Sequence, residues 1–182
     1  MSQGQITLSN SKVFGWMDMP YTRAGDSGRN RLQRVQAAVD AFRPLVDFKQ
    51  FHGVVVVLND YPVGPDGTQS AETGFAGQAS ASLADGSVHR LAAVILDPGG
   101  QFHSIVAQEV GHALGLNHSF GPFLDEYGDP YDVMSGMNGI RTFNSANFGP
   151  AGPGINAANR VLASWNPPRD DRDRLGIAIA RF

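Results

Sequence analysis

The sequence predicts a single domain of the α+β class over residues 1–182, with separate helices and strands joined by long loops. From Arg29 to Phe42, apolar residues recur at three- and four-residue spacing with charged residues between them, which indicates an amphipathic helix. The continuous β-branched run from Val54 to Leu58 indicates a strand that is buried on both faces. The 22 Gly and 11 Pro imply many turns and a modest helix content.

Composition narrows the class of protein. A chain of 182 residues with 42% hydrophobic and 17% charged residues can bury a substantial core. The net charge of -3 argues against a nucleic-acid or membrane partner, because such partners attract basic surfaces. The absence of cysteine excludes disulfides, cysteine-based zinc sites and thiol nucleophiles. No leader pattern is visible at the N-terminus, so either the protein is not exported or the sequence is a mature fragment with an added start codon.

The remaining elements follow from local pattern. A first strand is expected within residues 5–18. The small residues from Gly74 to Leu83 fit an edge strand that another backbone can approach. The Asp85-Gly86 pair marks a turn. The other expected elements are a strand over His89–Leu96, a helix over Gln101–Leu114, a helix over Ile155–Trp165 and a final strand over Leu175–Phe182.

The most informative stretch runs from Val106 to Ser119. Gln108 and His112 are four residues apart, so both lie on one face of a helix and can hold one metal ion. The helix residues Phe102, Val106 and Val110 are expected to face the core, and this polar face to point the other way. Gly115 can end the helix in a left-handed conformation, which lets His118 return toward the same ion from another direction.

Glu109 stands next to the first ligand position, where a metalloprotease places its general base. A bound metal ion lowers the pKa of its water from about 15.7 toward roughly 7. Glu109 is placed to take a proton from that water and to pass it to the leaving amine.

The segment Q-E-V-G-H-A-L-G-L-N-H-S, followed by E-Y-G-D-P-Y-D-V-M-S, resembles the metzincin metallopeptidases, most closely the gametolysin (autolysin)-like group. The resemblance is strong over 106–136 and weaker elsewhere. It implies a twisted, mostly parallel sheet with an active-site helix, and a small irregular C-terminal subdomain. The subdomains would span 1–118 and 119–182, with the substrate cleft between them.

The same resemblance implies a secreted, monomeric zinc endopeptidase that binds a protein or peptide substrate in extended form. Its metal ligands would be Gln108, His112 and His118, and its base would be Glu109. Met134 would form the Met-turn, a hydrophobic floor beneath the metal. The edge strand over 74–83 would line the cleft and pair with the substrate.

Gln108 departs from the family motif, which has histidine there. An amide oxygen binds zinc less well than imidazole does, so copper or another divalent metal is also possible. Three interpretations stay open: a native ligand with an altered metal preference, an engineered substitution that weakens the site, or a naturally weakened domain. The last leads to the alternative function, a non-catalytic peptide- or matrix-binding domain that keeps the protease fold.

Other polar residues carry weaker signals. His103 cannot share the helix face of His112, so it is expected at the surface or at the helix cap, or as a substitute ligand if the helix starts later. His52 and His89 adjoin predicted strands, and structural roles are expected for both. Four acidic residues could bind calcium through oxygen. Their alternative role is to orient Met134 or a ligand histidine. These residues are Asp125, Glu126, Asp129 and Asp132.

Overall fold

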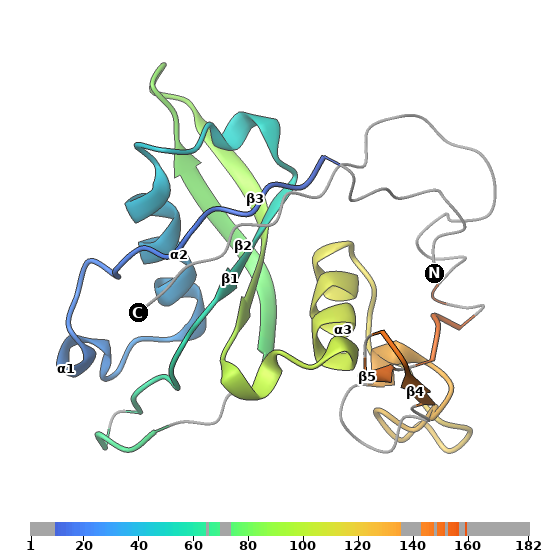
Figure 1. Cartoon of the computed structure of the whole chain (residues 1–182). Coiled ribbons are helices and arrows are strands. Elements are labelled where there is room, and N and C mark those ends of the chain that lie inside the picture. The colour runs from blue at the N-terminus through green and yellow to red at the C-terminus, as the bar shows by residue number, and fades with distance from the viewer. Residues whose placement is uncertain are drawn as a thin grey trace. The chain divides into compact units, whose positions relative to one another are not determined.

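The computed structural model describes residues 10–64, 66–69, 74–135, 143–147, 149–151, 153–156 and 159. The described chain divides into two compact units between Gln101 and Phe102, and each is treated by itself (Figure 1). Residues up to 101 are called the sheet unit, and residues from 102 onward the site unit. The division falls ahead of the motif helix, whereas the sequence placed a subdomain boundary after residue 118.

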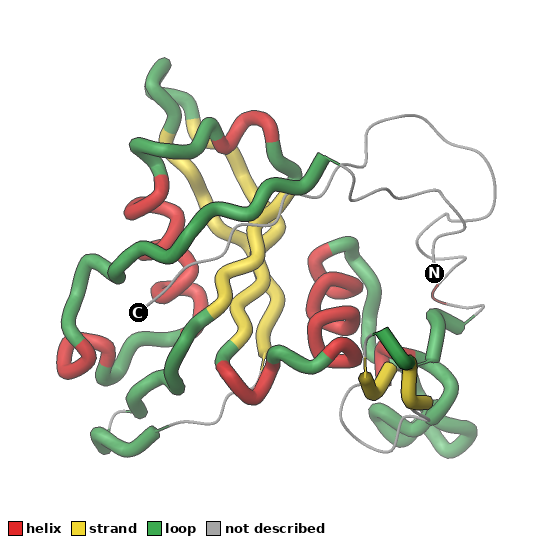
Figure 2. Tube along the Cα trace, in the orientation of Figure 1, coloured by secondary structure: helices red, strands yellow, loops and turns green. Residues whose placement is uncertain are grey.

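The sheet unit contains β1 (Gly53–Val57), β2 (Gly74–Ser82) and β3 (Val88–Leu96), in the spatial order β1-β3-β2. β1 runs parallel to β3, and β2 runs antiparallel to it. The strands are drawn in yellow in Figure 2. The α+β class is therefore correct. The expected mostly parallel sheet is corrected to a mixed one within the described residues.

The antiparallel pair follows from the short connection between β2 and β3. Leu83 N–H donates to the Ser87 carbonyl at 2.9 Å, and the Asp85 carboxylate accepts from Ser87 N–H at 3.0 Å. Gly86 has φ +79°, a left-handed value that suits glycine. So short a connection can join only antiparallel neighbours, because a parallel crossover needs a dozen or more residues.

Two helices precede the sheet in the chain, α1 (Arg23–Asp26) and α2 (Arg31–Phe42). Asn30 and Gln33 form a reciprocal capping box at the start of α2, with both hydrogen bonds at 2.8 Å. This cap explains why the helix begins at Arg31 rather than at the predicted Arg29. The buried face of α2 carries Val35, Val39 and Phe42 of the apolar residues at this spacing, whereas Leu32 is exposed.

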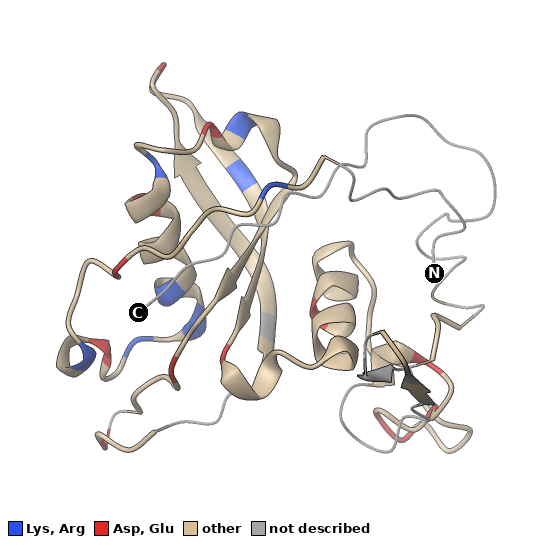
Figure 3. Cartoon of the chain, in the orientation of Figure 1, with Lys and Arg blue, Asp and Glu red and all other residues tan. Residues whose placement is uncertain are grey.

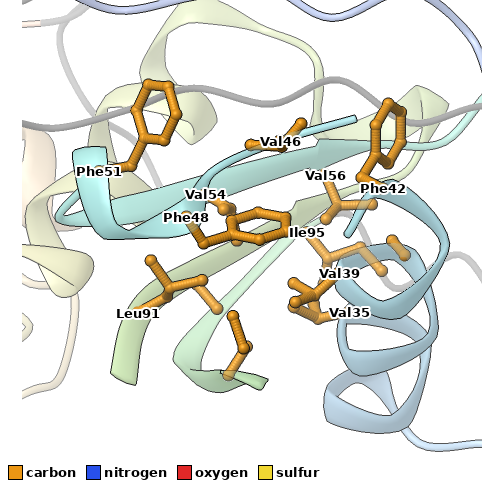
Figure 4. Close-up of a cluster of buried hydrophobic side chains, with 14 of the residues drawn as sticks. Val35, Val39, Phe42, Val46, Phe48, Phe51, Val54, Val56, Leu91 and Ile95 are labelled. Atoms are coloured by element: carbon orange, nitrogen blue, oxygen red, sulfur yellow. The ribbon is translucent and has the colours of Figure 1, made fainter. Parts of the chain in front are cut away.

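The core of the sheet unit is apolar (Figure 4). Val35, Val39 and Phe42 of α2 lie beside the β-strand residues Val56 and Ile95 in this view. Burying a large apolar side chain contributes about 1.5–3 kcal/mol. The short helices η1 (Phe48–Gln50) and η2 (Pro98–Gly100) complete the unit, and η1 adds the buried Phe48.

No strand forms in residues 10–18, the described part of the range where a first strand was expected. Two of the apolar residues that suggested it, Phe14 and Met17, pack against the core instead, whereas Val13 and Trp16 are exposed. The Phe14 ring lies 6.3 Å from the Phe42 ring and 6.0 Å from the Phe51 ring, centroid to centroid. These contacts bury the side chain without any strand pairing.

β2 is an edge strand of this sheet, as predicted. Its backbone at Ser80 is bonded to the side chain of Gln36 in α2. Ser80 N–H donates to Gln36 Oε1 at 3.0 Å, and Gln36 Nε2 donates to the Ser80 carbonyl at 2.7 Å. The helix thus satisfies the backbone of the edge strand at this residue.

The site unit contains α3 (His103–Ala113), η3 (Val133–Ser135), β4 (Phe143–Ser145) and β5 (Gly149–Ala151). Its apolar cluster is small and centres on Leu116, Val133 and Met134. The predicted helix over 155–165 lies mostly outside the described residues, and the final strand over 175–182 lies wholly outside them. Within the described residues, no helix has the length and apolar character that crossing a membrane requires.

Candidate metal centre

α3 carries three of the residues that the motif singled out. Gln108 and Glu109 are buried, with 6% and 8% of their surface exposed. Gln108 Nε2 lies 3.4 Å from His112 Nε2, as expected for residues one helical turn apart. The expected burial pattern is partly wrong, since Phe102 is exposed and Val106 is only half-buried while the polar pair is covered.

The end of α3 turns the chain back toward the helix. Leu116 N–H donates to the Gly111 carbonyl at 3.0 Å, and Gly115 N–H donates to the His112 carbonyl at 2.9 Å. These two bonds form a Schellman motif, and Gly115 has the left-handed φ of +88° that the motif requires. The predicted role of Gly115 is confirmed.

His112 is held in one orientation. Its Nδ1–H donates to the Leu116 carbonyl at 2.8 Å, which leaves the lone pair on Nε2, the atom that faces Gln108 Nε2 at 3.4 Å. Burial lowers the pKa of His112 below its ordinary value, and the neighbouring His118 lowers it further, although the Leu116 bond acts in the opposite direction. The net effect favours the neutral imidazole, which is the form that binds metals.

His118 comes back to the same place. Its ring centroid lies 4.6 Å from that of His112, with the two rings at 71°. His118 Nδ1–H donates to Glu126 Oε1 at 2.5 Å. The Tyr127 hydroxyl donates to His118 Nε2 at 3.0 Å. Glu126 had been considered as a partner of a ligand histidine, whereas Tyr127 had not been singled out from the sequence.

A tight loop positions Glu126 and Tyr127. Phe120 and Glu126 form an isolated antiparallel bridge, and Tyr127 N–H donates to the Ser119 carbonyl at 2.8 Å. Burial raises the pKa of Tyr127, and the negative charges of Glu126 and Glu109 raise it further. The hydroxyl is therefore protonated at neutral pH and can donate.

Met134 packs against α3 beside the first histidine. It is fully buried, and a Cβ atom added at Gly111 would lie 2.5 Å from its Sδ. The residue before His112 must therefore be glycine if Met134 is to lie this close. Ser119 N–H donates to the Met134 carbonyl at 3.2 Å, which joins the turn to the segment after His118. The close approach at Gly111 places η3, which contains Met134, against α3.

Asp132 anchors that turn. It is fully buried, and its carboxylate accepts from the Ser119 hydroxyl, from Asn159 Nδ2 at 2.9 Å and from Met134 N–H at 3.0 Å. Asp129 accepts from Asn156 Nδ2 at 3.1 Å. These hydrogen bonds support the scaffold role that was expected of the acidic residues.

Three further histidines lie among the described residues. His89 Nε2 lies 3.0 Å from the Phe51 carbonyl in the sheet unit. His52 belongs to the sheet unit too, and His103 is the exposed first residue of α3. Among the described residues, no group of three or more His, Cys, Asp or Glu side chains could hold a metal ion. The expected set contains only two residues of those types, together with Gln108.

The donor atoms have spacings that fit one ion. Two ligands bound to a tetrahedral zinc ion at about 2.0–2.1 Å are separated by roughly 3.3 Å. The 3.4 Å between the Gln108 amide and His112 Nε2 is close to this separation. A half-turn of the amide would present its oxygen in place of its nitrogen.

The charge around the site is negative. The described residues of the site unit include no Lys or Arg (Figure 3). Their acidic side chains are Glu109, Asp125, Glu126, Asp129 and Asp132. An excess of one sign raises the local concentration of counter-ions, so this unit attracts cations.

In comparisons with known proteins, no family model, no curated protein and no solved structure matches the chain.

Proposed function

We propose that the chain is a secreted metal-dependent endopeptidase that hydrolyses peptide bonds of protein substrates. One observation carries the proposal. Both histidines have Nδ1 bonded to a protein acceptor, His112 to Leu116 and His118 to Glu126, so that Nε2 is left for a ligand. Such orienting bonds typically accompany histidines that bind metals, because they select the tautomer and the ring orientation.

In this proposal Gln108, His112 and His118 hold a zinc ion, or copper or another divalent metal. The bound ion would supply an acidified water and would polarise the scissile carbonyl. The carboxylate of Glu109 takes up a proton and returns it to the leaving amine. Glu109 is buried on the helix that also carries Gln108 and His112.

The first experiment separates metal binding from catalysis. We expect the full chain to bind zinc in a calorimetric titration and to cleave an unstructured protein. His112→Ala should lose both properties. Glu109→Gln should keep zinc but lose cleavage by about 10²–10⁴-fold, the usual contribution of a general base.

If the unmodified chain binds neither zinc nor copper and cleaves no protein, an enzymatic function is excluded. Metal binding without any cleavage would favour the alternative, a peptide- or matrix-binding domain that keeps the site.

The variant Gln108→His then tests the role of residue 108, for which three interpretations are open. If Gln108 is a weakened position, imidazole should raise zinc affinity by at least about tenfold, which is 1.4 kcal/mol, and should raise cleavage as well. If Gln108 is a native ligand, cleavage should stay level or fall. Circular dichroism of both proteins controls for changes in folding.

A further inference from the structure

The side chain of Tyr127 contacts His118, the second histidine of the candidate site. Its hydroxyl oxygen is 3.0 Å from His118 Nε2, the nitrogen that Glu126 leaves free. The rings of Tyr127 and His118 are 4.3 Å apart at their centroids, with an interplanar angle of 47°. The hydroxyl is therefore directed at the ligand atom of the histidine.

The spacing of these two atoms resembles that of the other donor pair. Two ligands of one tetrahedral ion are separated by roughly 3.3 Å. The Tyr127–His118 pair is at 3.0 Å and the Gln108–His112 pair is at 3.4 Å. The two imidazoles lie 4.6 Å apart at their ring centroids, so the two pairs adjoin each other.

The backbone at Tyr127 holds the side chain in this position. Tyr127 has φ +64°, a left-handed conformation that is strained for a residue with a Cβ atom. It is kept there by its N–H bond to the Ser119 carbonyl at 2.8 Å and by the following bond from Gly128 N–H to the Asp125 carbonyl at 3.0 Å. Such strained residues cluster at functional sites.

We propose that Tyr127 is a fourth metal ligand of this site, together with Gln108, His112 and His118; this rests on the metal site of the proposed function. On ligation the Tyr127 O–H bond breaks, its proton leaves to solvent, and the oxygen bonds to the ion. The donors are then two imidazole nitrogens and two oxygens. A set of mixed nitrogen and oxygen ligands favours copper(II) more than a set of three imidazoles does.

The test uses copper(II) titrated into the full chain, with absorption spectroscopy as the readout. A phenolate bound to copper(II) gives a charge-transfer band in visible light, which imidazole and amide ligands do not give. The wild-type chain should develop this band at one equivalent of copper. Tyr127→Phe should lose the band and bind copper about tenfold or more weakly. The matched control is Tyr131→Phe, on the same segment with Tyr131 68% exposed, and it should change neither.

The outcomes separate this ligand from the proposed function. If copper binds, depends on His112 and gives no charge-transfer band, Tyr127 is not a ligand and the metal site stands. If the unmodified chain binds zinc but no copper, the fourth ligand is ruled out and the proposed function stands; if it binds neither metal and cleaves no protein, both proposals fall. Resonance Raman spectra of the wild-type complex provide a readout that does not depend on how the variant folds. Phenolate ring vibrations must appear on excitation in the band, and their absence overturns the assignment.

Discussion

Val35, Phe48 and Leu91 are buried among other apolar side chains in the sheet unit, whereas the buried centre of the site unit contains Asp132 and Ser119 bonded to each other. The first arrangement is held mainly by burial of apolar surface, which has no direction. The second is held by hydrogen bonds that each require one partner at one place. Each buried polar residue at the centre of the site unit can therefore be replaced by fewer other residue types.

The two arrangements differ in how strictly they restrict the residues that can form them. An apolar core accepts side chains of similar volume, because packing can adjust. A buried carboxylate with three donors accepts no neutral apolar replacement, because each donor left unpaired costs about 1–3 kcal/mol. The polar centre around Asp132 is therefore stricter than the apolar cluster of the sheet unit.

The largest effect is expected at Asp132. Asp132→Ala removes the acceptor of the Ser119 hydroxyl and of the Met134 N–H, and one of the acceptors of the Asn159 amide. It should lower the free energy of unfolding by about 3–5 kcal/mol. Urea denaturation measures this. Asp66→Ala, at an exposed loop residue, serves as the control. If both variants lose the same stability, the polar centre does not support the site unit.

The apolar core should respond to size rather than to chemistry. Leu91→Ala should cost about 2–5 kcal/mol, because Leu91 is buried and its loss leaves a cavity. Leu91→Met keeps the volume and should cost less than about 1.5 kcal/mol. Thermal unfolding of the pair checks both values. An equal loss in the two variants would mean that the sheet unit is packed as strictly as the site unit.

Gly111→Ala should have an intermediate effect. Alanine favours the helix by about 1 kcal/mol, but its Cβ would lie 2.5 Å from the buried Met134 sulfur. Overpacking of this kind typically costs about 1–3 kcal/mol, so a net loss and a displaced His112 are expected. Stability and zinc affinity should fall together. Adding Met134→Ala should recover part of the loss, and additive losses in the double variant would contradict the contact.

The smallest effect is expected at the exposed pair of Lys49 and Asp85, whose nitrogen and oxygen are 2.6 Å apart. The hydrogen bond to Lys49 lowers the pKa of Asp85, and the bond to Asp85 raises the pKa of Lys49. The carboxylate therefore stabilises the fold above its unfolded pKa of about 3.9 and loses this effect as the pH falls. The ammonium stabilises the fold below its unfolded pKa of about 10.4 and loses this effect as the pH rises.

Lys49→Met should therefore lower the melting temperature slightly at neutral pH and low salt. The difference from wild type should shrink below about pH 3.9 and in high salt, where the charges are neutralised or screened. Melting curves over pH and ionic strength check this. A difference that does not depend on either would assign the effect to packing of the lysine chain.

Much of the sheet unit could be predicted because its elements follow repeating patterns. α2, β1, β2 and β3 lie within a few residues of their expected ranges. The direction of β2 was missed, because the parallel sheet came from the family resemblance. The Asp85-Gly86 turn between two strands was the signal that could have corrected it, since such a turn joins a hairpin.

The site was predictable only in part, for a different reason. Helical spacing was enough to bring Gln108, Glu109 and His112 together, and Gly115 returned His118 to them. The contacts of Glu126 and Tyr127 cross an irregular loop, which no periodicity describes. Tyr127 also has a left-handed backbone that tyrosine rarely adopts, so the sequence carried no sign of its orientation.

The bonds between Gln36 and Ser80 have a consequence for how copies of the chain meet one another. An exposed edge strand is a template on which a second sheet can grow, and this is a common start of aggregation. Because Gln36 occupies both backbone groups of Ser80, an incoming strand cannot continue its ladder past that residue. One glutamine on a neighbouring helix thus protects the chain in solution from open-ended stacking along β2.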